Sequence, residues 1–137
     1  MTFVDNLGLK ANIMIDDEGV PLIKDQGFRY SIGCFAGLRW TPPEVHCNEE
    51  ASYTTMSDIY SLGMTILEVM TGNCPYFQFP QHTMALSLIS GHQFPLRPEN
   101  FPDEIWSLLV SCWDWIPERR PTANVVLAWL DVLRLMF

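Results

Sequence analysis

The stretch Arg39-Trp40-Thr41-Pro42-Pro43-Glu44 decides the predicted fold, because further short patterns stand on either side of it in a fixed order. The patterns are Asn12, Asp25-Gln26-Gly27, Ser57-Asp58-Ile59-Tyr60-Ser61-Leu62-Gly63, Cys112-Trp113 and Pro117-Glu118-Arg119-Arg120-Pro121-Thr122. A single Asp-x-Gly pattern carries no information by itself. The prediction therefore rests on the order and spacing of the whole set.

Composition limits the chain to one compact, acidic domain. The 137 residues suffice for a single domain, and 48% of them are hydrophobic. The net charge of -8 argues against nucleic acid as a partner, because phosphate binding requires a basic patch. We expect no membrane association and a cytoplasmic location, because no apolar run reaches about 18 residues and no signal peptide is visible. The four cysteines show no metal-ligand spacing, so we expect reduced thiols.

The first half of the chain predicts a hairpin, a loop and a long central helix. Two apolar runs, 13–15 and 21–23, flank a turn that contains Gly19, which is typical of a β-hairpin. Residues 28–44 show no period and predict a loop. Polar N-cap candidates at 54–58 and Gly72 as a stop signal predict a helix that ends at Thr71. That helix is apolar on nearly every side, which predicts a central, buried position.

The second half predicts three more helices. Residues 81–90 form a plausible short helix that Gly91 closes, and another helix begins at Pro102-Asp103. Thr122 is the expected N-cap of the last helix. With no repeat and no internal linker, we expect a single domain over residues 1–137.

Together these motifs resemble the C-terminal half of a eukaryotic protein kinase, from the catalytic loop onward, over nearly the whole chain. The resemblance implies a mainly α fold: a kinase-like C-terminal lobe with a short β-hairpin and with the N-terminal lobe absent. Arg39-Trp40 and Cys112-Trp113 look most like the tyrosine kinase and tyrosine-kinase-like branches, and the choice between Ser/Thr and Tyr specificity stays open. ATP and Mg²⁺ are cofactors that the family implies, and nothing else in the sequence indicates them.

The resemblance also assigns site positions. In protein kinases an Asp of the catalytic loop takes the substrate proton, while an Asn and a second Asp hold magnesium. Asn12 and Asp25 match the two metal ligands, although Gln26 replaces the Phe of Asp-Phe-Gly. Leu7 or Gly8, depending on the register, occupies the position of the base, and neither accepts a proton. Asp5 could reach the site only through a shifted loop. We therefore expect no catalytic residue in this chain.

Five further positions have structural roles in the family. Glu44 and Arg120 correspond to a buried ion pair that ties the activation segment to the last helices, and a bidentate Arg suits that pairing. Asp58 corresponds to an acceptor for the catalytic-loop backbone, or it is simply an acid that favours a helix N-terminus. Trp40 and Trp113 are expected core aromatics. Tyr30 and Ser31 are weak candidates for phosphorylation, since no Arg cluster accompanies them.

The leading interpretation is a kinase-like fragment that is catalytically inactive, as a pseudokinase or a truncated kinase, and acts at most as an interaction module. One alternative is part of an active ATP-dependent Ser/Thr or Tyr kinase whose N-terminal lobe lies outside this chain. Another is a helical adaptor unrelated to kinases. We expect a protein partner or self-association through an exposed apolar surface, because Leu62, Ile66, Leu67 and Met70 would lack the helix that normally covers them.

Overall fold

The structure is a computed structural model, which describes residues 13–23, 37–46, 48 and 53–136. Strand β1 (Ile13–Ile15) pairs antiparallel with β2 (Pro21–Ile23), with Met14 opposite Leu22. The turn between them is closed by the Asp16 carboxylate, which accepts hydrogen bonds from the backbone N–H groups of Glu18 and Val20. Gly19 has φ of 83°, a conformation that glycine adopts without steric cost. The predicted hairpin is confirmed.

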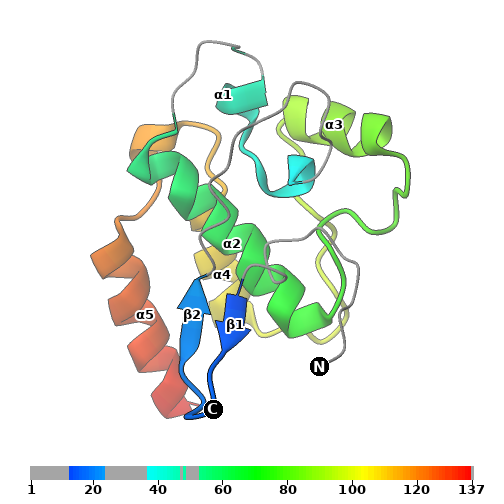
Figure 1. Cartoon of the computed structure of the whole chain (residues 1–137). Helices are drawn as coiled ribbons and strands as arrows, with labels where there is room; N and C mark the ends of the chain where they lie inside the picture. Colours follow the sequence, from blue (N-terminus) through cyan, green and yellow to red (C-terminus); the bar gives the residue numbers. More distant parts are fainter. Residues whose placement is uncertain (1–12, 24–36, 47, 49–52, 137) are drawn as a thin grey trace.

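Helix α2 (Thr55–Thr71) runs through the middle of the molecule (Figure 1). Thr54 and Ser57 form a reciprocal capping box at its start, in which each side chain accepts a hydrogen bond from the other's backbone N–H. Gly72, with φ of 75°, ends the helix in the left-handed conformation. Both predicted bounds are therefore confirmed, because the capping signals are local and need no tertiary partner.

The other helices surround α2. Helix α4 (Asp103–Cys112) makes the most extensive contact with it, and α5 (Ala123–Met136) packs on α4. Figure 1 shows α5 on one side of α2, with α3 (His82–Ser90) and the short α1 (Pro43–His46) on the other. The core is built mainly from Trp40, Ile59, Tyr60, Met64, Leu67, Tyr76, Ala85, Ile89, Phe101, Leu108, Leu109, Cys112, Trp113, Val126 and Leu133. The fold is mainly helical with one hairpin, as predicted.

Helix α2 is less uniformly buried than its composition predicts. Leu67 is buried in the core, and Ile66 is partly buried. The prediction that Leu67 is exposed is therefore wrong. Leu62, Val69 and Met70 are exposed. The difference arises because α4 and the segment before α1 already cover one side of the helix. The apolar surface that remains on α2 is therefore smaller than the sequence indicates.

The loop predicted for residues 28–44 is wrong for its described end. Residues Leu38–Trp40 form a 3-10 helix, η2, and α1 begins at Pro43. Gly37, with φ of 84°, precedes η2, and Pro43 suits the first turn of a helix, where no backbone N–H is needed. A second 3-10 helix, η3 (Pro117–Arg119), leads into α5. Among the described residues, no helix is long and apolar enough to cross a membrane.

Candidate functional site

Arg39 fixes the start of the decisive stretch to the loop after α2. Its guanidinium donates to the carbonyl oxygens of Pro75 (3.1 Å), Tyr76 (2.6 Å) and Phe79 (2.6 Å). The side chain is buried, and the positive charge is held by backbone dipoles at these three contacts. A guanidinium suits such a site because its donors have fixed, divergent directions. Residues 36 to 40 positions apart in sequence are thereby joined.

Trp40 fixes the same stretch to the middle of α2. Its indole Nε1 donates to Glu68 Oε2 at 3.1 Å, and both side chains are buried. The Ser61 hydroxyl, about two turns before Glu68 in α2, donates to the Trp40 carbonyl oxygen at 2.8 Å. A buried carboxylate requires such donors, because burying an unpaired charge is costly. Trp40 is thus a core aromatic whose polar atom is also used.

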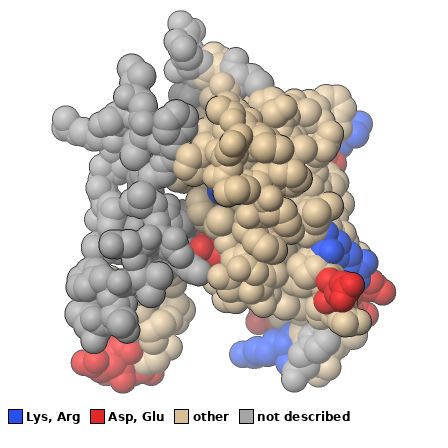
Figure 2. All heavy atoms as spheres, turned by 90° about the vertical axis from the view of Figure 1, so that its right-hand side faces the viewer, with Lys and Arg blue, Asp and Glu red and all other residues tan. Residues whose placement is uncertain are grey.

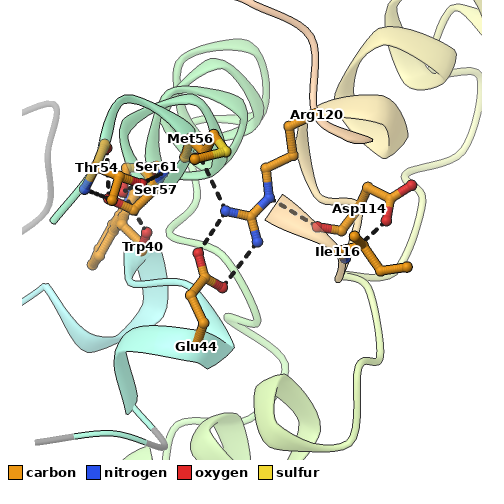
Figure 3. A network of polar contacts seen from close by, with 9 residues as sticks. All are labelled: Trp40, Glu44, Thr54, Met56, Ser57, Ser61, Asp114, Ile116 and Arg120. Carbon is orange, nitrogen blue, oxygen red and sulfur yellow. Dashed lines mark hydrogen bonds and ion pairs between the residues drawn. The ribbon is translucent and has the colours of Figure 1, made fainter. Parts of the chain in front are cut away.

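Glu44 and Arg120 form a two-pronged ion pair (Figure 3). Arg120 Nη1 lies 2.7 Å from Glu44 Oε1, and Nη2 lies 2.9 Å from Oε2. The Arg120 side chain is fully buried, whereas that of Glu44 is 30% exposed. Two parallel charge-assisted hydrogen bonds fix both distance and orientation. The structure therefore brings together two residues that are 76 positions apart in sequence.

Arg120 also binds two backbone carbonyls. Its Nε donates to the Asp114 carbonyl at 2.8 Å, and Nη1 donates to the Met56 carbonyl at 3.0 Å (Figure 3). The guanidinium carbon lies 5.2 Å from the centre of the Tyr60 ring, within the range of a cation–π contact. Arg120 thus joins α1, the first turn of α2 and the loop after α4 at a single point.

A pair of buried tyrosines extends the network toward α3. Tyr60 and Tyr76 are both buried and near enough for each to influence the pKa of the other, and the Tyr76 hydroxyl donates to the Gln93 carbonyl oxygen at 2.7 Å. Burial raises the pKa of Tyr60 well above its ordinary value, and the neighbouring Tyr76 raises it further. Burial also raises the pKa of Tyr76. Both phenols therefore remain neutral hydrogen-bonding groups and cannot supply a general base at neutral pH.

Asp58 and Trp113 occupy places that differ in burial. Asp58 lies exposed in the first turn of α2, where its charge favours the helix dipole. Trp113 is buried against Gly63 of α2 and stacks edge-on with Trp106. In the described part of the chain, Trp113 Nε1 is the buried side-chain polar atom for which no hydrogen-bond partner is found. It lies within the packed core.

His46 is the last residue of α1 and is partly buried against η2. Its Nε2 lies 3.0 Å from the Leu38 carbonyl oxygen. Burial lowers its pKa, although hydrogen bonds to the Leu38 and Thr41 carbonyls and the nearby Glu44 carboxylate oppose the shift. His82 begins α3, and His92 lies against Trp115. Among residues 13–23, 37–46, 48 and 53–136, no cluster of ligating side chains could hold a metal ion.

The predicted catalytic and metal positions lie outside the described residues. These are Leu7, Gly8, Asn12 and Asp25, together with the phosphorylation candidates Tyr30 and Ser31. Arg39, a basic residue near those candidates in sequence, has its guanidinium bound to carbonyl oxygens inside the fold. The Arg39 guanidinium therefore stabilises the fold.

Sequence reasoning missed Arg39, Glu68, Tyr60 and Tyr76 as members of the network. Glu68 left a signal, because an acid within an apolar helix requires a partner if it is buried. Arg39 left none, since its partners are backbone carbonyls that no side-chain pattern reveals. The described network contains hydrogen-bonded anchors and neutral phenols, and it holds the 37–46 segment in place. The role of these side chains is therefore to hold that segment in position.

Comparison with known proteins places this network in a family. A model described as protein tyrosine and serine/threonine kinase matches residues 7–130. The mouse tyrosine-protein kinase Srms is 35% identical over 106 residues, which cover 77% of this chain and 21% of the relative. A mitogen-activated protein kinase kinase kinase 1b of Physcomitrium patens is 31% identical and covers 85% of this chain and 16% of the relative.

A third relative, the Drosophila tyrosine-protein kinase Src64B, is 34% identical over 82% of this chain and 19% of its own length. The chain therefore spans about a fifth of the length of the curated relatives that it matches. The match with the family begins at residue 7 and includes every anchor described above. The Glu44–Arg120 ion pair thus stands within a family match that covers most of the sequence, and the chain belongs to the family of protein tyrosine and serine/threonine kinases.

Proposed function

We propose that this chain is a catalytically inactive C-terminal-lobe segment of the kinase family that acts through contact with a protein partner. The observation that carries the proposal is the residue at the catalytic-base position. That position holds Leu7 or Gly8, whichever register is used, and neither side chain can accept a proton. Loss of a general base typically costs 10²–10⁴-fold in rate.

The anchoring network supports a role in contact. Arg39, Trp40, Glu44 and Arg120 are buried or partly buried and paired, so the elements around α2 are held firmly. A chain without any function would not be expected to retain both the buried guanidinium and its carboxylate. Either charged group left alone in the interior would strongly destabilise the fold. The chain therefore retains the interactions that shape a surface while the base position has lost its acid.

Nucleotide binding provides the first test of this proposal. Asn12 and Asp25 match magnesium ligands, but two protein ligands hold a hydrated divalent ion loosely unless phosphates bridge it. We expect no saturable rise in melting temperature when MgATP is added at sub-millimolar concentration. A ligand at 100 times its Kd stabilises a protein by about 2.7 kcal/mol, which such a titration readily detects.

Two variants make the titration specific. Asp25→Ala removes the proposed ligand, and Asp17→Ala removes an exposed acid from the hairpin turn as a matched control. A saturable shift that Asp25→Ala abolishes and Asp17→Ala leaves intact would show that the chain holds MgATP, contrary to the expected lack of nucleotide binding. A small shift common to all three proteins would reflect ionic strength and leave the proposal standing.

A second function is favoured by the comparisons. The matched relatives carry the names of protein kinases, and the chain spans about a fifth of their length. The chain is then one part of a longer ATP-dependent kinase whose nucleotide-binding lobe is encoded elsewhere. The transcript around this reading frame distinguishes the two. A glycine-rich loop and a strand with a Val-Ala-x-Lys pattern upstream of residue 1 favour the kinase. Their absence favours the contact module.

The third interpretation, an adaptor outside the kinase family, is set aside by the family match.

A further inference from the structure

We propose that Arg39 holds α3 and the loops beside it in a closed arrangement, from which they open together as one unit. We call residues 75–93 the α3 unit, which comprises the loop after α2, α3 itself and the start of the loop after α3. Arg39 lies outside this unit, in the 37–46 segment. The unit is therefore a conformational device that couples α3 to that segment, and the inference does not depend on the proposed inactivity.

The first observation is a strained backbone at Tyr76. Its φ of 58° lies in the left-handed region, which a bulky aromatic residue rarely adopts. His92 and Asn100 share this conformation, but both are exposed, and His and Asn adopt it more readily. Tyr76 is only 2% exposed, so its ring is enclosed by neighbouring groups. A strained conformation of this kind persists only where the surrounding structure holds it.

The second observation is that Arg39 holds the loop that carries this strain. Its Nη1 donates to the Pro75 and Tyr76 carbonyls, and its Nη2 donates to the Phe79 carbonyl. The Tyr76 carbonyl also accepts from the Phe79 backbone N–H at 2.9 Å, which closes the turn. Because a guanidinium presents its donors as a rigid planar fork, these bonds fix the three carbonyls relative to the 37–46 segment. Loss of the bonds frees the loop to leave the strained conformation.

The third observation is that the strained residue is joined to the far end of α3. The Tyr76 hydroxyl donates to the Gln93 carbonyl oxygen at 2.7 Å, and the Gln93 backbone N–H donates to the Leu88 carbonyl oxygen at 2.9 Å. The loop after α2 therefore supports α3 at both ends, through the chain at its start and through Tyr76 at its end. Helix α3 also packs on η2 and α1, and Figure 1 shows α1 and α3 on the same side of α2. A movement of the loop thus changes the support of the whole helix.

The fourth observation is that α3 itself is shallowly buried and uncharged. Within the helix only Ala85 and Ile89 are buried. No acidic or basic residue lies between Glu68 and Arg97, so the Arg39 guanidinium brings to this contact a charge that the unit lacks. Figure 2, which faces the side where α3 lies, accordingly shows a broad tan area. A region with few buried apolar contacts opens at a lower free energy than the core does, so the charge-assisted bonds from Arg39 decide whether it stays closed.

The closed and open arrangements differ in two sets of contacts. In the closed arrangement Arg39 binds the loop and the Tyr76 hydroxyl binds the Gln93 carbonyl, and in the open arrangement both sets are broken. A protein that binds α3 in only one arrangement therefore shifts the population toward that arrangement. Because coupling between two sites is reciprocal, such binding also alters how the 37–46 segment is held.

Hydrogen exchange of single amides, followed by NMR on the purified chain, tests the proposal. The probes are the Phe79 and Gln93 backbone N–H groups, which are bonded within the unit, and the Trp113 N–H, bonded to the Leu109 carbonyl, is the reference outside it. Arg39→Met removes the donors and the buried charge but keeps an unbranched side chain. We expect both probes to exchange at least about tenfold faster and by a similar factor, because they open together once the charge-assisted bonds are lost. The exchange rate of the Trp113 N–H should not change.

Arg97→Met is the matched control, because Arg97 also donates to a backbone carbonyl, that of Phe101, but its side chain is 40% exposed. We expect this variant to leave the exchange of both probes unchanged. Circular dichroism melting shows that each variant is folded before it is compared. If Arg39→Met does not melt cooperatively, Arg39→Lys takes its place, because a compact ammonium keeps the charge but not the planar fork. We expect the same pair of probes to exchange faster in it.

Tyr76→Phe separates the two sets of contacts, because it removes the hydroxyl and keeps the ring and the bonds from Arg39 to the loop. We expect the Gln93 N–H to exchange faster in this variant while the Phe79 N–H stays protected. Adding Arg39→Met to Tyr76→Phe should then accelerate the exchange of the Gln93 N–H by a smaller factor than Arg39→Met does alone, because contacts that act in series are not additive.

Three outcomes overturn the proposal. The first is an equal acceleration of the probes and of the Trp113 N–H in Arg39→Met, which would mean that the whole fold is weakened. The second is faster exchange at Phe79 without faster exchange at Gln93, which would mean that the loop and α3 open separately. The third is the same effect for Arg39→Met and Arg97→Met. The result is independent of the nucleotide titration, because these variants leave the proposed magnesium ligands and the base position unchanged.

Discussion

At the scale of single residues, Arg120 shows how one buried charge fixes three segments. Its guanidinium is fully enclosed and bonded to Glu44, Met56 and Asp114. Its position within Arg119-Arg120-Pro121-Thr122 and its link to Glu44 could be predicted from the sequence, because both residues belong to recognisable motifs. The carbonyl bonds of Arg39 could not be predicted, since backbone acceptors leave no trace in the order of side chains.

Replacing Glu44 by Gln should strongly destabilise the chain. The change keeps the shape of the side chain but removes the charge that neutralises the enclosed Arg120 guanidinium. We expect a loss of about 3–5 kcal/mol in the free energy of unfolding, the usual cost of leaving one half of a buried pair alone. Urea denaturation at neutral pH measures it.

The Arg97–Asp103 pair provides the control for this prediction. Its side chains are 40% and 84% exposed, so Asp103→Asn should cost only about 0–1 kcal/mol. Equal losses for Glu44→Gln and Asp103→Asn would contradict the role given to burial.

His46 predicts a pH dependence. Burial lowers its pKa below the ordinary value of 6.5, so the folded chain favours the neutral imidazole more than the unfolded chain does. Its contribution to stability is therefore complete above about pH 6.5 and is lost as pH falls through that value toward the lowered pKa. We expect His46→Gln, which keeps an N–H donor for the Leu38 carbonyl, to lose less stability than the unchanged chain between pH 7 and pH 5. Identical pH profiles for the two proteins would exclude this role.

At the scale of elements, the ends of the longer helices could be predicted from the sequence, whereas the short helices at 38–40 and 43–46 could not. Thr54, Gly72 and Gly91 mark ends that local hydrogen bonds determine. The short helices at 38–40 and 43–46 depend instead on tertiary contacts of Arg39 and Trp40, which periodicity does not report. The same reason explains Leu67, whose burial depends on neighbours from other elements.

Gly63 tests the contact between α2 and α4. A Cβ at this position would lie 2.7 Å from Trp113 Nε1 and 2.9 Å from Cys112 Cβ, distances that force the two elements apart. Gly63→Ala should therefore lower the free energy of unfolding by about 1–3 kcal/mol, although alanine is the better helix former.

Trp113→Phe removes one of the two clashing groups and provides a double-mutant cycle. We expect the Gly63→Ala penalty to be smaller in the Trp113→Phe background, with a coupling energy of about 0.5 kcal/mol or more. A penalty that is unchanged in that background would show that the indole does not limit the approach of the two segments. Thermal denaturation of the four proteins supplies the cycle.

At the scale of the whole molecule, the chain combines a kinase-family scaffold with Leu7 or Gly8 at the position of the family's catalytic base, and the proposed inactivity rests on that combination. The scaffold and its main anchor followed from ordered motifs, and the family match covers residues 7–130. The contact between the Tyr76 hydroxyl and the Gln93 carbonyl, which joins the loop after α2 to the loop after α3, could not be predicted from the sequence, because its acceptor is a backbone carbonyl. The sequence predicted an exposed apolar surface on α2, but the apolar side chains of that helix are partly buried.

Turnover of radiolabelled ATP by the purified chain is the most direct test of the central claim. Generic Ser/Thr and Tyr peptides serve as acceptors, and Asp25→Ala serves as the control that removes the remaining family metal ligand. We predict that phosphate transfer by the chain does not exceed that of Asp25→Ala, because a Leu or Gly at the base position orients no nucleophile. Transfer by the chain that disappears in Asp25→Ala would contradict the account, because it would show that these residues perform phosphoryl transfer.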